Sequence, residues 1–211
     1  MININNRIDE NRGREEPAFS AGSGMSFDVS SSEELNQAIQ AGYPREQIVY
    51  NSGDISLEVT KMAVNHRIGR IIVYGTEELK MIEGVCREKS QKVNALLHIP
   101  SVGNNLIHEF ITKGNSDFNF ELPQNPALLS SVFRSMLCSQ YVNLLGFHFH
   151  MDSRFSDKES CQNMTLVLLD LILNLKQTYG FNTAELNIGG FNFRISKDGG
   201  KLPSFAFNLC H

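Results

Sequence analysis

The chain has 211 residues, of which 41% are hydrophobic, 20% charged and 9% aromatic, and this composition excludes a disordered or collagen-like chain. The net charge of -4 comes without a long run of like charges, so we expect neither a nucleic acid nor a membrane as a partner. The four cysteines are widely spaced, which favours reduced thiols, and no signal peptide or spanning segment is evident. These features predict a cytoplasmic protein.

Short strand-like runs alternate with longer segments of helical period along the chain. We predict a flexible leader over 1–23, one folded domain over 24–195 and a C-terminal tail over 196–211. The strand-like runs cover 25–29, 47–50, 69–75, 93–99, 142–151 and 183–189, and the helical segments cover 33–42, 57–66, 76–89, 125–139 and 157–180. Ser-x-x-Glu capping boxes at Ser31 and Ser156 mark two helix starts.

This alternation predicts an α/β fold of parallel βα units, which we interpret as a TIM-type (β/α) barrel. Such a barrel closes at eight strands, and about six are visible, so we expect an incomplete barrel. Strands 25–29 and 183–189 would then border a gap with unpaired backbone groups, part of which the leader or the tail KLPSFAFNLCH could cover. On this basis the free chain is expected to self-associate, to aggregate or to need a partner.

Active sites of parallel α/β folds collect at the carboxyl ends of strands, and several polar residues stand there. Period-2 alternation in GFHFHM puts His148 and His150 on one face, where they could pack, bind a metal or carry a planar cofactor. Gly189 and Gly190 could approach a phosphate or simply form a turn. Asp28 could be an active-site carboxylate or could bond the next helix N-terminus.

The order of several motifs resembles a known family. FDVSSSEEL, GYPREQIVYNSG, GRIIVYGTEEL, VNALLHIP, GFHFHMDS and LNIGGFNF follow one another as in the barrel domain of the pyridoxal-phosphate-dependent decarboxylases that act on diaminopimelate, ornithine and arginine, which has the alanine-racemase-like fold. The similarity spans roughly residues 24 to 195. Each motif alone is weak, but their order and spacing together are specific.

The resemblance implies pyridoxal 5'-phosphate as the cofactor and a set of residues that bind it. The family's histidine that stacks on the cofactor ring matches His150, and its phosphate-binding serine matches Ser153. The glycine turn, also a phosphate site, matches Gly189 and Gly190, and the acidic residue of the F-D-x-x-S motif matches Asp28. A flat ring and a dianionic phosphate need such partners.

The chain also departs from the family's pattern. The family's Schiff-base lysine lies on the first barrel strand, before FDVSS, whereas the first lysine here is Lys61, on a predicted outer helix. His98 stands where the family has an arginine, and Asp152 stands where it has the glycine before the phosphate-binding serine. Asn187 replaces an acidic residue, and Phe191 replaces the third glycine of the glycine turn. The family's last barrel strand and C-terminal β-domain have no counterpart before His211.

Three hypotheses follow. The first is a decarboxylase-like barrel domain that is inactive alone and has no catalytic residue of its own, unless a second polypeptide completes it. The second is a non-catalytic pseudoenzyme that binds or regulates a family decarboxylase. The third, a metal-dependent hydrolase using His148 and His150, is the weakest because no third ligand stands out, so we expect no metal site.

Overall fold

The computed structural model describes residues 2–7, 26–53, 55–99, 126–150 and 158–189. The strands are β1 Ile2–Arg7, β2 Ser26–Val29, β3 Ile48–Tyr50, β4 Arg70–Val73, β5 Val93–Ile99, β6 Val142–His150 and β7 Glu185–Gly189. The helices are α2 Ser32–Gln40, the short 3-10 helix η1 Arg45–Gln47, α3 Leu57–His66, α4 Thr76–Lys89, α6 Pro126–Cys138 and α7 Lys158–Tyr179.

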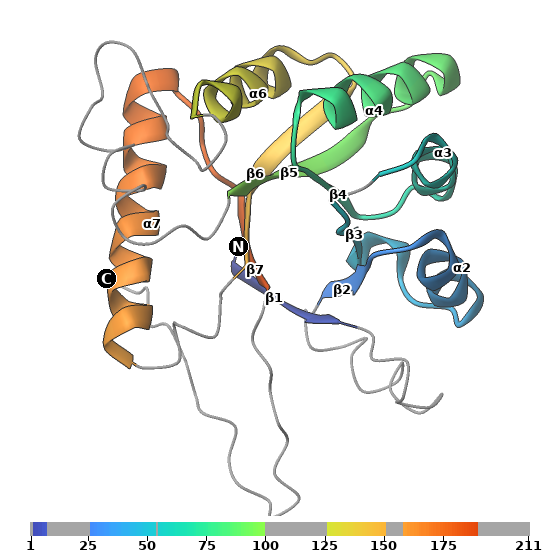
Figure 1. Ribbon diagram of the computed structural model, residues 1–211, viewed down its shortest axis with the longest axis horizontal. Coiled ribbons are helices and arrows are strands. Elements are labelled where there is room, and N and C mark those ends of the chain that lie inside the picture. Colours follow the sequence, from blue (N-terminus) through green and yellow to red (C-terminus); the bar gives the residue numbers. More distant parts are fainter. Residues whose placement is uncertain (1, 8–25, 54, 100–125, 151–157, 190–211) are drawn as a thin grey trace, which may run out of the picture.

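The strands form one closed parallel barrel in the order β1-β2-β3-β4-β5-β6-β7. Each strand pairs in parallel with the next, and β1 pairs with β7. The helices lie outside the strands, with α2, α3, α4, α6 and α7 following one another around the barrel (Figure 1). The predicted parallel βα barrel is therefore confirmed, and all six predicted strands occur at their predicted places.

The flexible leader predicted over 1–23 is wrong for its first residues. Ile2–Arg7 is strand β1, which joins β2 at Asn6↔Phe27 and β7 at Asn3↔Asn187. The two strands predicted to border a gap are thus both paired, and the sheet closes with seven described strands. The predicted exposed edges, and the self-association argued from them, lose their basis.

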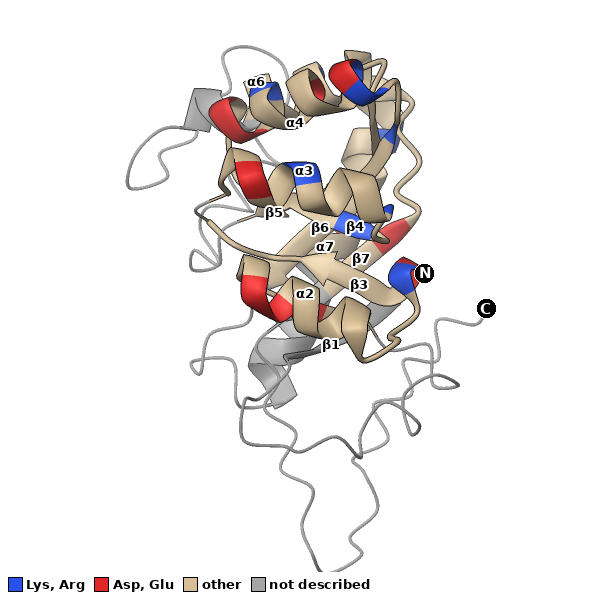
Figure 2. Ribbon diagram, turned by 90° about the vertical axis from the view of Figure 1, so that its right-hand side faces the viewer, with Lys and Arg blue, Asp and Glu red and all other residues tan. Residues whose placement is uncertain are grey.

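Helix starts follow the capping predicted from the sequence. The Ser31 hydroxyl accepts a hydrogen bond from the Glu34 N–H at 3.1 Å, so Ser31 is the N-cap of α2, a contact that stabilises a helix by about 1 kcal/mol. The capping box predicted at Ser156 lies outside the described residues. The first turns of α2, α3 and α4 carry acidic residues, which suit the positive end of a helix dipole (Figure 2).

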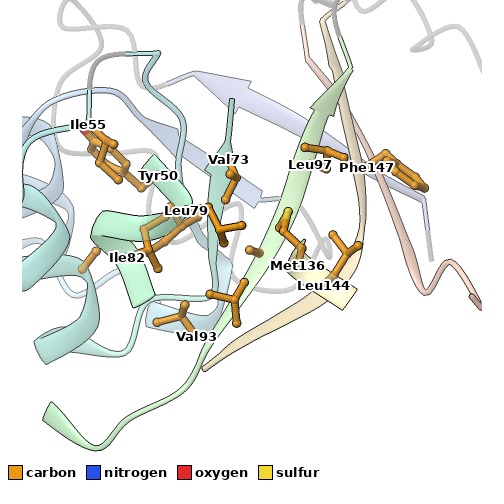
Figure 3. Packing of buried hydrophobic residues seen from close by; sticks show 14 of the residues in the cluster. Tyr50, Ile55, Val73, Leu79, Ile82, Val93, Leu97, Met136, Leu144 and Phe147 are labelled. Atoms are coloured by element: carbon orange, nitrogen blue, oxygen red, sulfur yellow. The ribbon is translucent and has the colours of Figure 1, made fainter. Parts of the chain in front are cut away.

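The main apolar core lies between the barrel and the helices. Outward residues of the strands, such as Val73, Leu97 and Phe147, belong to the same buried cluster as Leu79 and Ile82 of α4 (Figure 3). All five are at most 2% exposed, and fully burying such a side chain stabilises the fold by about 1.5–3 kcal/mol. Across the described residues, no helix is both long and apolar enough to cross a membrane.

The side chains inside the barrel form layers, and the inward residues of β4 give one member of each layer from the amino end of the strand to its carboxyl end. Arg70 lies nearest the amino ends of the strands and forms a partly buried ion pair with Glu185 of β7, with 2.7 Å between Nη2 and Oε2. Ile72 packs above it with Val49 and Leu96, and all three are fully buried. The next inward position is Tyr74, directly after the end of β4, which begins the polar layer at the carboxyl ends of the strands.

Candidate functional site

Six polar side chains lie around the carboxyl end of the barrel, and we call them the polar ring. Strands β3, β4 and β5 position three of them by simple alternation, because Asn51, Tyr74 and His98 lie two residues beyond the buried interior residues of their strands. The polar ring consists of Asp28, Asn51, Tyr74, His98, His148 and Asn187.

A β-bulge brings His148 onto the inner face of β6. The register between β5 and β6 shifts at Ala95/Leu96, opposite Gly146, and realigns as His98↔His148. A side chain at Gly146 would overlap the backbone carbonyl of Glu185, so the close approach of β6 and β7 there requires glycine. Beyond the bulge, Phe147 points outward into the core and His148 points inward, with 1% exposure.

Asn51 links most of the polar ring. Its Nδ2 donates to Asp28 Oδ2 at 3.0 Å and lies 3.4 Å from His148 Nε2, while its Oδ1 accepts from the Tyr74 hydroxyl at 2.5 Å. On the far side of the imidazole, His148 Nδ1 lies 2.9 Å from Asn187 Oδ1. A hydrogen-bonded chain therefore crosses the barrel from β4 to β7.

The Tyr74 phenol is held in its neutral form. Burial, and then the negative charges of Glu78 and Asp28, raise the pKa of Tyr74 to about 12. Glu78 is also the backbone anchor of this residue, because its Oε2 accepts from the Tyr74 N–H at 2.5 Å. The Tyr74 hydroxyl therefore keeps its proton at any physiological pH.

Three side chains of the polar ring, those of Tyr74, His98 and His148, have aromatic rings that are neighbours. The Tyr74 and His98 rings are 4.3 Å apart and tilted by 31°, and His98 lies 5.4 Å from His148. These separations are typical of favourable ring contacts. Among the described residues, no group of histidine, cysteine, aspartate and glutamate side chains is suited to hold a metal ion.

The residues predicted as a cofactor site divide into two groups. Asp28 lies in the polar ring, and the backbone of His150 pairs with that of Gly189 where β6 and β7 end. Ser153 and Gly190, like Asp152 and Phe191, lie outside the described residues. His148 points inward as predicted, and Lys61 lies on the outer helix α3.

The sequence interpretation missed Asn51, Tyr74 and Glu78. Asn51 reads as part of the turn NSG, and Tyr74 and Glu78 read as a strand end and a helix start. The signal that could have found Asn51 and Tyr74 is the period-2 spacing from Val49 and Ile72. Directly after β2, the Ser30 N–H donates to Glu34 Oε2 of helix α2 at 2.6 Å.

The opposite end of the barrel carries an open cavity. Its lining includes Arg67, Lys92 and Asn143, near the amino ends of β5 and β6. Parallel βα barrels place their chemistry at the carboxyl ends of the strands and their stabilising contacts at the amino ends. The polar ring is therefore the better candidate site.

Comparison with known proteins gives a consistent result. Residues 18–204 match the model of the family described as "pyridoxal-dependent decarboxylase, pyridoxal binding domain". The chain is 31% identical over 176 residues to diaminopimelate decarboxylase of Bacillus subtilis, covering 83% of this chain and 40% of that protein. It is 30% identical over 184 residues to the same enzyme of Bacillus methanolicus, covering 86% and 42%. The chain thus spans less than half the length of these relatives.

Solved structures share the fold. Diaminopimelate decarboxylase from M. jannaschii, in co-complex with L-lysine, superimposes with a TM-score of 0.72 at 23% identity, covering 93% of this chain and 45% of that one. Alanine racemase of Clostridium difficile 630, in complex with cycloserine, gives a TM-score of 0.63 at 15% identity, covering 95% and 53%. At these identities the likeness concerns the barrel alone.

Proposed function

Because the chain belongs to the pyridoxal-dependent decarboxylase family, through its pyridoxal-binding domain, we propose that it binds pyridoxal 5'-phosphate at the carboxyl ends of its strands. His150 would stack on the pyridine ring, and Ser153, Gly189 and Gly190 would bind the phosphate. The pairing His150↔Gly189 supports this assignment, because it brings the two family positions to adjacent strand ends. Asp28 would complete the site from β2.

The residues present suit binding better than chemistry. When bound, pyridoxal phosphate supplies an electron sink for a carbanion formed at an amino acid, and the family holds it through a lysine amine. One observation carries the proposal that this 211-residue chain does not decarboxylate: β1, which precedes and pairs with the Asp28 strand, reads ININNR and has no lysine. No lysine occurs before Lys61, which lies outside the barrel.

The proposed role of the chain is therefore a decarboxylase-like barrel of the diaminopimelate, ornithine and arginine type that is inactive alone. The relatives' names favour a diaminopimelate-type origin. A partner that restores turnover would have to supply the lysine amine that is missing from β1. The cytoplasmic location expected from the sequence stays a prediction.

The test is a titration of the purified chain with pyridoxal phosphate by equilibrium dialysis. We expect saturable binding, and His150→Ala should weaken it about 2- to 12-fold, which corresponds to the 0.5–1.5 kcal/mol of a ring contact. His66→Ala on the outer helix α3 is the matched control and should bind as wild type. Equal effects of the two variants would contradict the proposed ring partner.

Turnover is measured in the same preparation. We expect no release of carbon dioxide from diaminopimelate, ornithine or arginine, with or without added cofactor. Turnover that co-purifies with the chain, and that persists after removal of host decarboxylases, would overturn the proposal of inactivity.

A second candidate function is regulation of a family decarboxylase by a chain that keeps the barrel. The observation that favours it is the combination of a closed parallel sheet in the described residues with the absence of a lysine from β1. Adding the purified chain to a diaminopimelate decarboxylase should then change that enzyme's rate. An unchanged rate at a large excess of the chain would exclude this function for that enzyme.

A further inference from the structure

One amide nitrogen in the polar ring contacts both a carboxylate and an imidazole. Asn51 Nδ2 lies 3.0 Å from Asp28 Oδ2 and 3.4 Å from His148 Nε2. The amide has two N–H groups, which is enough to donate to both acceptors. The Asn51 amide therefore connects the Asp28 carboxylate to the His148 imidazole.

The carboxylate decides which way the Asn51 amide faces. If the amide were flipped, its oxygen would lie about 3 Å from Asp28 Oδ2, and two acceptors without a proton between them repel. The Tyr74 hydroxyl does not discriminate, because a neutral phenol can donate to Oδ1 or accept from Nδ2. Among the described contacts of this amide, the one with Asp28 therefore keeps Nδ2 on the side of His148 Nε2.

The orientation of the amide in turn decides where the imidazole carries its proton. Nδ2 can only donate, so His148 Nε2 must accept, and the ring proton lies on Nδ1. The Nδ1–H then donates to Asn187 Oδ1 at 2.9 Å. Since His148 is 1% exposed, bulk water does not compete for these positions.

We infer that Asp28, acting through Asn51, is a positioning residue that holds His148 as the neutral Nδ1–H tautomer. Among the described residues, the charged and titratable groups that face this imidazole include Asp28 of β2, Tyr74 just after β4 and His98 of β5, while β7 presents the neutral Asn187. Both ring nitrogens are engaged, so the function of His148 is to present an uncharged ring rather than to bind a metal or transfer a proton. This inference goes beyond the proposed function and does not depend on cofactor binding.

The test uses the full chain with 15N-labelled histidine and long-range 1H–15N correlation spectra, which distinguish the two neutral tautomers and the imidazolium by the shifts of the ring nitrogens. The chain has six histidines, and His148→Gln identifies the signals of this one. At pH 8 we expect a protonated Nδ1 and an unprotonated Nε2. An Nε2–H tautomer or an imidazolium would overturn the inference.

Three variants test the role of the carboxylate. Asp28→Asn lets the Asn51 amide face either way, so the Nδ1–H population should fall from nearly all to roughly half. Tyr74→Phe leaves the carboxylate in place and should keep the wild-type tautomer. Asp170→Asn, the same change at an exposed position of α7, is the matched control and should have no effect.

A fourth variant covers the case in which Asp28→Asn does not fold. Asn51→Leu removes the intermediary and keeps both ends, so His148 should again lose its preference for Nδ1–H. A wild-type pattern in either Asp28→Asn or Asn51→Leu, or an equal shift in Asp170→Asn, would overturn the inference. If only Tyr74→Phe lost the Nδ1–H tautomer, the phenol and not the carboxylate would determine the tautomer of His148, and the inference would be wrong.

Discussion

Replacing Glu185 by Leu while leaving Arg70 in place is expected to destabilise the barrel by about 3 kcal/mol, because the guanidinium loses its buried counter-charge. Arg70 Nε donates to both carboxylate oxygens, at 2.9 and 2.8 Å, and Nη2 lies 2.7 Å from Oε2. Breaking a buried pair from one side costs about 3–5 kcal/mol. The low end applies because the Arg70 side chain is 19% exposed and Nη1 still donates to the Glu46 carbonyl.

The assay is a double-mutant cycle followed by denaturant unfolding and circular dichroism. Glu185→Leu and Arg70→Met should each cost about 3 kcal/mol, which lowers the melting temperature by about 6–12 °C for a domain of this size. The double variant replaces the ion pair by an apolar pair of similar volume and should lie within about 1 kcal/mol of wild type. A double variant as unstable as the sum of the singles would refute this account of the lowest barrel layer.

Three further predictions concern the sheet closure and two titrating side chains. Deleting residues 1–7 should leave the edges of β2 and β7 unpaired, which should lower the melting temperature and cause self-association in sedimentation. A monomer with an unchanged melting temperature would show that β1 is dispensable. The pKa of Tyr74 rises from 10 unfolded to about 12 folded, so stability should fall as pH rises from 10 to 12, and Tyr74→Phe should remove that part of the slope. Burial, and then the charge of Glu83, raise the pKa of the Cys86 thiol to about 11. Iodoacetamide should therefore label the exposed Cys138 before Cys86, and faster labelling of Cys86 in peptide mapping would contradict its burial.

The sequence predicts the central strands well because burial on both faces leaves short runs of mainly apolar residues. RIIV of β4 and VNALLHI of β5 are examples, since the outward residues enter the helical core and the inward ones fill the barrel. The segment ININNR has only two apolar residues, and its pairing partners lie about 20 and 180 residues away in the sequence. A local window does not contain that information, so β1 reads as part of a leader.

The candidate site was predicted in part for the same reason. His148 is predicted to point inward because alternation along GFHFHM is a local property, and the structure confirms it. The contacts of Asn51 with Asp28 and His148 join residues 23 and 97 positions apart, and they depend on barrel closure. Asn51 by itself has only the sequence signature of a turn residue.

The central claim is that this chain holds pyridoxal phosphate without a covalent bond to a lysine, and borohydride reduction followed by peptide mapping tests it most directly. A Schiff base between the cofactor and a lysine amine becomes a stable phosphopyridoxyl label on reduction, whereas a non-covalently bound cofactor is removed by dialysis. The account predicts saturable binding in dialysis but no stoichiometric label on any peptide of the barrel. One equivalent of label on a single barrel lysine would contradict it and would show that another amine has replaced the family's lysine.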